Sequence, residues 1–193
     1  MTGEQAGQDG AKKIKILAAA KELFGRFGFK KTTVDEIATG AGVSKRTIYE
    51  VFSSKEQILA DLVVHEALTF RKSCLVQIRQ AGDAREKLRI LFDMSTQYFD
   101  ENPFLGQVLA DDQRLYEPFL GDEIDWVEQG IKGIIASILD EGVQQGVFRS
   151  MNVPAVAQCV LVLFRGFTYQ KTSREDGNSE WVPFVMHAIS APE

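Results

Sequence analysis

Two helix-start signals on either side of a glycine-rich turn constrain the fold of this chain more than any other feature. Thr33 precedes Glu36 by three residues, which is the spacing of a capping box, in which a hydroxyl and a carboxylate each accept a backbone N–H. A short helix is therefore predicted directly after Thr33. Its apolar pattern stops at residues 40–42, where glycine suits a tight turn. Ser44 can then cap a second short helix, predicted over residues 44–51.

The second of these helices is unusually polar for a structural helix. Its predicted outer face carries Lys45, Arg46, Thr47 and Tyr49. Side chains of these types donate hydrogen bonds to phosphates and to base edges. Ser54 and Lys55 begin a third helix beside it, and a helix N-terminus with an adjacent lysine favours a phosphate. The pattern indicates a DNA-binding helix-turn-helix, and an ordinary solvated helix pair is the alternative.

Residues 42–59, GVSKRTIYEVFSSKEQIL, closely resemble the signature of TetR-type transcriptional regulators, with TVDEIA at residues 33–38 in the expected place upstream. The resemblance covers residues 10–60 in motif detail and the remainder through length, helical pattern and order of elements. It implies that Thr33, Tyr49 and Lys55 contact phosphates. It implies equally that Lys45, Arg46 and Thr47, on the helix capped by Ser44, approach the major groove. Many members have Gly in place of Arg46 and His or Tyr in place of Val51, so no operator sequence carries over.

Charge is distributed unevenly along the 193 residues. Residues 1–55 hold ten Lys and Arg against six Asp and Glu, and the remainder holds twelve against twenty-one, so parts of +4 and −9 give the net charge of −5. This asymmetry favours DNA contact by the N-terminal end only. With 45% hydrophobic residues, the chain is long enough for two small helical domains. We predict a disordered tail over residues 1–10, a DNA-binding domain over 11–55 and a ligand-binding and dimerisation domain over 56–193.

The helical pattern continues to the C-terminus, with no alternating strand pattern and no internal repeat. A first helix is predicted over residues 11–27 and a long connecting helix over 54–80. Further helix boundaries are predicted at Asp83 with Glu86, at Asn102–Pro103, after Gly121–Asp122, at Gly146 and at Asn152–Pro154. We therefore predict an all-α fold of about nine helices: an N-terminal three-helix helix-turn-helix domain and a C-terminal helical regulatory domain.

The last two predicted helices are more apolar than one face of a small domain requires. Their apolar residues are Val156, Val160, Leu163 and Phe167 on one helix, and Trp181, Phe184, Val185 and Ile189 on the other. Paired with their twins around a two-fold axis, two such helices form a four-helix dimer interface, as the resemblance also implies. A monomer core is the alternative. In a dimer, two recognition helices about 34 Å apart enter successive major grooves of a palindromic operator.

The resemblance implies a ligand cavity between the central helices, but it does not supply the lining. The candidates are Phe92, Ser95, Tyr98, Phe104, Trp126, Gln129 and Phe164. Aromatic residues in central helices can line a ligand pocket, and they can equally belong to the hydrophobic core. The expected effector is a small apolar or amphipathic molecule.

Motifs for other classes of function are absent from the sequence. His65 and His187 have no partner at a metal-ligand spacing, so no metal site and no cofactor are expected. No GxSxG, GxxxxGK[ST] or GxGxxG motif occurs, and no enzyme activity is predicted. The longest apolar run, residues 159–164, is far shorter than the roughly 20 residues of a membrane span, and no secretory segment is found. We expect a cytoplasmic protein with Cys74 and Cys159 as buried or half-buried free thiols.

These observations together predict a ligand-responsive DNA-binding regulator. The chain is expected to bind a palindromic operator as a homodimer, most simply as a repressor, and to leave it when a small molecule occupies the C-terminal domain. A helical small-molecule binding protein without operator binding is the second hypothesis, and an all-helical enzyme is the third. Salt separates the first two, because counterions compete with phosphate contacts.

Overall fold

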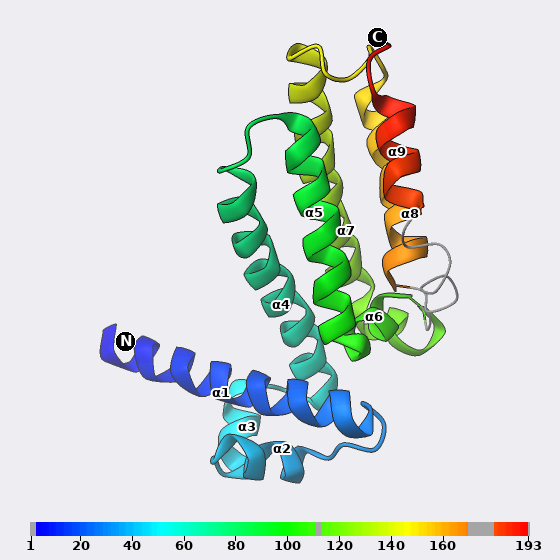
Figure 1. The fold of residues 1–193 in the computed structure, drawn as a ribbon. Coiled ribbons are helices and arrows are strands. Elements are labelled where there is room, and N and C mark those ends of the chain that lie inside the picture. The colour runs from blue at the N-terminus through cyan, green and yellow to red at the C-terminus, as the bar shows by residue number, and fades with distance from the viewer. Residues whose placement is uncertain (1–2, 111–112, 170–179, 193) are drawn as a thin grey trace.

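The protein is helical throughout the part of the chain that the computed structural model describes, residues 3–110, 113–169 and 180–192 (Figure 1). In chain order the helices are α1 (Gly3–Phe27), α2 (Val34–Ala41), α3 (Lys45–Val51), α4 (Lys55–Ile78), α5 (Ala84–Glu101), α6 (Pro103–Ala110), α7 (Gln113–Gln144), α8 (Val153–Tyr169) and α9 (Trp181–Ile189). Within these ranges the only β pairing is an isolated bridge between Phe148 and Ser190. The predicted all-α fold is confirmed.

Helices α1 to α3 form a small head at one end of the molecule, and α4 to α9 form the body (Figure 1). The head encloses its own apolar side chains, Ile16, Phe24, Ile37, Ile48 and Phe52, each at most 2% exposed. Thr33, Ser44 and Ser54 cap α2, α3 and α4 as the sequence predicts. Gly42 ends α2 with a φ of +64°, which costs a glycine little because it has no Cβ. The turn between α2 and α3 is therefore set by local chemistry.

The body is a bundle in which α4, α5, α7 and α8 lie alongside one another (Figure 1). Helix α6 lies at the end nearest the head, and α9 lies against α8. Helix α4 belongs to both parts. At its N-terminal end Ile58 and Leu59 are fully buried beside the head, and further along Cys74 is fully buried in the body. Helix α4 is therefore packed into both the head and the body.

Two predicted boundaries are wrong. Helix α1 begins at Gly3, so the tail predicted to be disordered over residues 1–10 is helical from that residue onward. The segment contains no proline, and Lys12 Nζ lies 3.2 Å from Asp9 Oδ1 at the i,i+3 spacing that supports a helix. Helix α7 also continues unbroken through Gly121, where a new helix was expected. One glycine inside a helix costs only about 1 kcal/mol, which neighbouring packing offsets.

Candidate functional site

The outer face of α3 is the first candidate site. Ser44 fixes the start of the helix, because Thr47 N–H donates to Ser44 Oγ at 3.0 Å and the two hydroxyl oxygens lie 2.8 Å apart. Ile48 turns into the core of the head and is 1% exposed. The exposed residues of α3 are Lys45, Arg46, Tyr49 and Glu50, and Tyr49 is 53% exposed. A short, capped helix with hydrogen-bond donors on its outer face is suited to a major groove.

The two basic side chains of α3, Lys45 and Arg46, each form an ion pair with an acidic neighbour. Lys45 Nζ donates to Asp35 Oδ2 at 2.8 Å, and Arg46 Nε donates to Glu50 Oε1 at 3.0 Å. The hydrogen bond to Asp35 and the charge of that carboxylate raise the pKa of Lys45, so its ammonium group stays charged. All of these side chains are exposed, and ion pairs in water are weak. DNA phosphates can therefore replace the carboxylates.

Thr33 acts as a helix cap in the structure. Its N–H and its hydroxyl each donate to Glu36 Oε2 at 2.8 Å, and Glu36 N–H donates to Thr33 Oγ1 at 3.3 Å. The hydrogen bonds from Thr33, the backbone one first, lower the pKa of Glu36 below its ordinary value. Thr33 is exposed and therefore accessible to a phosphate. The phosphate contact that the resemblance implies stays a prediction.

Lys55 is held within the protein rather than directed only at solvent. Its ammonium group donates to the carbonyl oxygens of Phe29 and Thr32, each at 2.8 Å, and lies 4.4 Å from the centre of the Phe29 ring. These contacts fasten the loop between α1 and α2 to the start of α4. An ammonium group has three N–H donors, so one is left for the phosphate contact predicted from the sequence.

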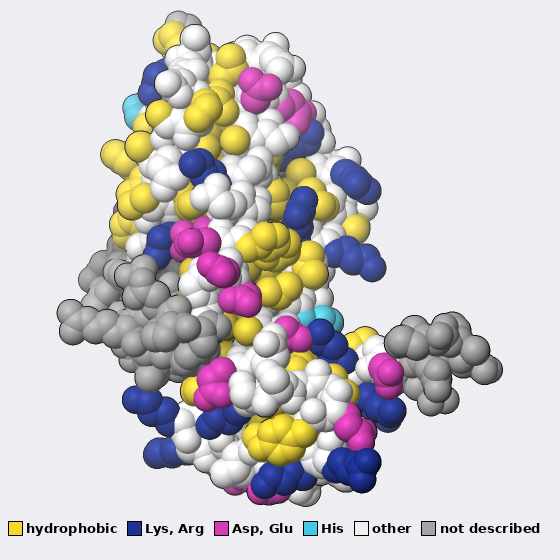
Figure 2. All heavy atoms as spheres, turned by 180° about the vertical axis from the view of Figure 1, so that it is seen from behind, with side chains coloured by type: hydrophobic (Ala, Val, Ile, Leu, Met, Phe, Trp, Pro, Cys, Tyr) yellow, Lys and Arg dark blue, Asp and Glu magenta, His cyan; other side chains and the backbone are white. Residues whose placement is uncertain are grey.

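Sequence reasoning missed Lys30 and Lys31. Both are exposed in the loop between α1 and α2, next to the cap of α2. Figure 2 shows Lys and Arg side chains gathered over the head, which fits its excess of basic residues. The sequence could have indicated these two lysines, because they follow Gly28, a residue typical of a helix end, and therefore lie in a loop. In the structure Gly28 has a φ of +81°.

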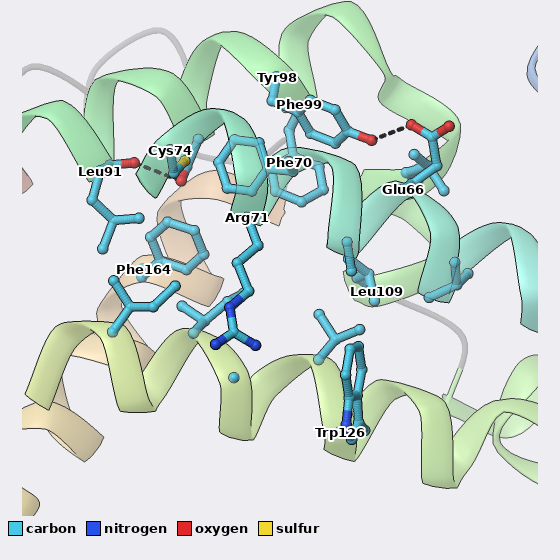
Figure 3. Close-up of a pocket in the computed structure, with 18 residues that line it drawn as sticks. Glu66, Phe70, Arg71, Cys74, Leu91, Tyr98, Phe99, Leu109, Trp126 and Phe164 are labelled. Atoms are coloured by element: carbon cyan, nitrogen blue, oxygen red, sulfur yellow. Dashed lines mark hydrogen bonds between the residues drawn. The ribbon is translucent and has the colours of Figure 1, made fainter. Parts of the chain in front are cut away.

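The second candidate site is a pocket inside the body, bounded by α4, α5 and α7 and closed by α6 and α8 (Figure 3). Its lining includes Glu66, Phe70, Arg71 and Cys74 of α4, Leu91, Ser95, Tyr98 and Phe99 of α5, Leu105 and Leu109 of α6, Trp126, Val127, Gly130, Ile131 and Ile134 of α7, and Phe164 of α8. The cavity volume is about 60 Å³. Most of the lining is apolar, so the pocket suits an apolar group.

Four of the seven predicted ligand residues line this pocket: Ser95, Tyr98, Trp126 and Phe164. The other three do not. Phe92 packs against Trp181, with ring centres 4.6 Å apart, and Phe104 packs against Phe24 of the head, with ring centres 5.7 Å apart. Gln129 is on the exposed face of α7. Core aromatic rings and pocket aromatic rings have the same helical spacing, so the sequence could not separate them.

A polar cluster joins this pocket to the head. Tyr98 donates its hydroxyl hydrogen to Glu66 Oε2 at 2.5 Å, and Lys21 of α1 donates to the same oxygen at 2.7 Å. Lys21 Nζ also lies 5.8 Å from the centre of the Tyr98 ring. Burial, and then the hydrogen bond to Glu66, raise the pKa of Tyr98 well above its ordinary value, so the phenol keeps its proton. One carboxylate on α4 thus holds a pocket residue and a head residue together.

The predicted dimer residues do not share one outward face. Val160, Trp181, Val185 and Ile189 are only 2–3% exposed within a single chain, so they offer little surface to a partner, and their place in a dimer interface stays a prediction. Val156, Leu163 and Phe167 are half-buried. Phe184 of α9 is 65% exposed, and Cys159 and Val162 of α8, which were not among the predicted residues, are exposed as well. Apolar residues surround both helices, so periodicity could not show which face the core takes.

Two other classes of site are absent from the parts of the chain described above. No group of three or more His, Cys, Asp and Glu side chains is placed to hold a metal ion. No helix there combines the length and the apolarity needed to cross a bilayer. Both cysteines are free thiols. Cys74 is buried as predicted, whereas Cys159 is exposed, so its predicted burial is wrong.

Comparison with known proteins gives a consistent result. The family model for bacterial regulatory proteins of the tetR family matches residues 16–62. The fatty acid metabolism regulator protein of Bacillus subtilis is 30% identical over 135 residues, covering 70% of each chain. The structure of the fatty acid degradation regulator FadR from Bacillus halodurans has 25% identity and a TM-score of 0.75, covering 91% of this chain and 93% of that one. FadR from Bacillus subtilis, solved with stearoyl-CoA, has 23% identity and a TM-score of 0.76, covering 93% and 99%.

Proposed function

This chain belongs to the TetR family of bacterial transcriptional regulators, and on that premise we propose which of its surfaces bind DNA, effector and a second copy. It is a ligand-responsive, DNA-binding regulator. Its relatives are regulators of transcription and not enzymes. We infer that it acts in the cytoplasm, where bacterial DNA lies, and that it represses its target genes.

The DNA-binding surface that we propose is the exposed side of the head. The observation that carries the proposal is the capped helix α3, whose Lys45, Arg46 and Tyr49 face outward while Ile48 anchors the helix from below. Thr47, Ser44 and Thr33 stand beside them with hydroxyl groups. Lys30 and Lys31 of the preceding loop add positive charge for phosphates. The DNA-binding unit then comprises α1 to α3 with the start of α4.

A second copy covers the exposed face of α8 and α9 in this proposal. Phe184 and Val162 are 65% and 57% exposed, and large apolar side chains so exposed on adjacent helices mark an interaction surface. Regulators of this family bind operator DNA as dimers. Val156, Leu163 and Phe167 of α8 are half-buried and keep part of their surface for this contact.

The pocket between α4, α5 and α7 is the effector site in this proposal. Its apolar lining agrees with the names of relatives that act in fatty acid metabolism, one of them solved with stearoyl-CoA. The cavity of about 60 Å³ is smaller than the roughly 150 Å³ of an engineered cavity that holds benzene. An effector larger than benzene must therefore move the pocket walls apart.

Movement of the walls reaches DNA through α4 and through the cluster of Tyr98, Glu66 and Lys21. Glu66 and Tyr98 line the pocket, and Lys21 is part of the head. An effector that shifts α4 or α5 changes the geometry of these hydrogen bonds and hence the position of α1. It releases DNA only because it binds the displaced arrangement more tightly than the DNA-bound one.

Selection of bound sequences from random duplex DNA tests the proposal. The purified protein is incubated at two salt concentrations, and bound fragments are sequenced. We expect an enriched palindrome whose binding weakens steeply with salt, and we expect a Tyr49→Ala variant to bind every selected sequence more weakly. Absence of enrichment at both salt concentrations would favour a small-molecule binding protein without an operator.

A further inference from the structure

We infer that the effector is an amphipathic anion whose charged group pairs with Arg71 at the mouth of the pocket, while its apolar chain lies inside the body. The inference rests on the proposed function of this pocket as the effector site. It narrows the effector from any apolar molecule to an acyl chain or a similar apolar group that ends in a carboxylate or a phosphate.

Two charged residues line the pocket, and they differ in their partners. The carboxylate of Glu66 already accepts hydrogen bonds from Lys21 and Tyr98. Arg71 has neither an ion pair nor a hydrogen bond to any residue that the structure describes, yet it extends across the pocket toward α7 (Figure 3). A guanidinium group offers five N–H donors in a planar fork that matches a carboxylate or a phosphate. The charged group of the lining that lacks a partner among the described residues is therefore the positive guanidinium group of Arg71.

The exposed and buried residues of the lining indicate how an amphipathic ligand is oriented in the pocket. Among the described lining residues, only Arg71 and Trp126 are exposed. Cys74, Leu91 and Phe164, which also line the pocket, are at most 1% exposed. The charged and aromatic side chains thus mark the side that meets solvent, and the apolar side chains mark the closed interior. An amphipathic molecule binds with its polar group outward and its chain inward.

The wall formed by α7 leaves room for such a chain. Gly130 lines the pocket, and a Cβ atom placed there would meet no atom within 4 Å. A larger side chain at this position projects into free space instead of into packed neighbours. Gly130 therefore offers a way to reduce the pocket without changing its charge.

The same electrostatics disfavour a cationic effector. Arg71 repels a positive group at the mouth, and the carboxylate of Glu66 is already neutralised by Lys21. A neutral amphiphile fills the apolar part of the pocket but leaves the guanidinium group unpaired. Discrimination between matched anionic and neutral chains therefore measures the role of Arg71.

Binding to the full-length protein tests the inference, with laurate, lauroyl-CoA and 1-dodecanol as probes of equal chain length below their micelle concentrations. The chain has two tryptophans, Trp126 at the pocket and the buried Trp181, so a Trp181→Phe background makes Trp126 fluorescence the reporter. We expect at least one anionic probe to bind clearly more tightly than 1-dodecanol. Arg71→Gln should weaken that probe at least about tenfold, because it removes the charge-assisted hydrogen bonds to the anionic group. The affinity for 1-dodecanol should not change.

Further variants separate the possible outcomes. Arg71→Lys should restore part of the affinity, because it keeps the charge and loses the planar fork. Gly130→Leu should weaken all probes that bind, and it reports on the pocket alone. Equal affinities for the anionic and neutral probes, unaffected by Arg71→Gln, would overturn the role of Arg71 and leave the pocket as the effector site. If no probe bound the unaltered pocket, both the inference and the proposed effector site would be wrong. Preference for laurate would identify a carboxylate as the anion, and preference for lauroyl-CoA would identify the phosphates.

Discussion

The head and the body of this protein present their functional groups in opposite ways. In the head, the side chains proposed to face DNA are on the surface, and helix caps such as Ser44 hold their backbone in place. In the body, the side chains that line the pocket are also core residues, and Leu91 and Phe164 are 1% exposed. The head exposes side chains such as Lys45, Arg46 and Tyr49 that its stability does not need, whereas the apolar side chains that line the pocket also hold the body together.

This difference predicts how substitutions should act. Changes on the surface of the head should alter DNA affinity and leave the free energy of unfolding unchanged. Changes in the pocket should alter both effector affinity and stability. Helix α4 is the exception to this separation of binding from stability, because Lys55 and Glu66 on this helix each form hydrogen bonds with residues of the head.

The first prediction is that one substitution in the body greatly weakens DNA binding by the head. Phe184→Asp places a charge on the proposed dimer face, and an unpaired charge is not tolerated in an apolar interface. We expect operator affinity to fall about a thousandfold, roughly 4 kcal/mol, because a monomer binds only one half-site. Fluorescence anisotropy with the selected operator and sedimentation of the free protein measure both effects. Val76→Asp, on the exposed face of α4, is the matched control and should change neither.

The second prediction concerns the junction between the two parts. Lys55→Met removes two hydrogen bonds from an ammonium group to backbone carbonyls, and bonds of this kind contribute about 1.5–3 kcal/mol each. We expect the free energy of unfolding to fall by about 3 kcal/mol in urea titrations. Arg46→Met, whose partner Glu50 is in water, should leave stability unchanged and weaken DNA binding. Equal stability of the two variants would show that Lys55 serves DNA contact alone.

These two variants also show why the sequence predicted the head better than the body. Caps are local: Thr33 and Glu36 are three residues apart, and their reciprocal hydrogen bonds follow from helix geometry. The use of Lys55 is not local, because its carbonyl partners are more than twenty residues away in the chain. Sequence reasoning thus placed Lys55 at the start of α4, directly after α3, but did not find its internal partners.

In the body, the sequence predicted the helices but not their inward faces. Val185 and Phe184 are adjacent and equally apolar, yet one is buried and the other is 65% exposed. Likewise Phe92 packs in the core and Phe164 reaches the pocket, although both are aromatic residues of central helices. Only the packing of distant helices against one another decides these cases. Arg71 was missed for the same reason, since an arginine on a long helix is ordinarily solvated.

The third prediction concerns the contact between the pocket and the head. Tyr98→Phe removes the hydroxyl that donates to Glu66 and keeps the ring that lines the pocket. A hydrogen bond of this type contributes about 1 kcal/mol, so we expect the effector to reduce operator affinity roughly fivefold less than in the unaltered protein. Operator affinity is measured with and without effector, and effector affinity is measured separately. Phe99→Leu, a change to another lining residue, is the control for altered packing. If both variants responded like the unaltered protein, the cluster would not carry the signal.

The smallest predicted effect is a pH dependence confined to the head. Hydrogen bonds from Thr33 hold the pKa of Glu36 below its ordinary value near 4.5, so the unfolded chain binds this proton more tightly than the folded one. The stability from the ionised carboxylate is therefore present above the unfolded pKa and is lost as the pH falls through the folded pKa. Glu36→Gln should remove this part of the pH dependence in urea titrations at successively lower pH. Thr33→Ala should retain most of it, because the backbone N–H of residue 33 contributes the larger share. If Glu36→Gln and the unaltered protein lost stability in parallel, the acid sensitivity would arise in the body and not in the cap.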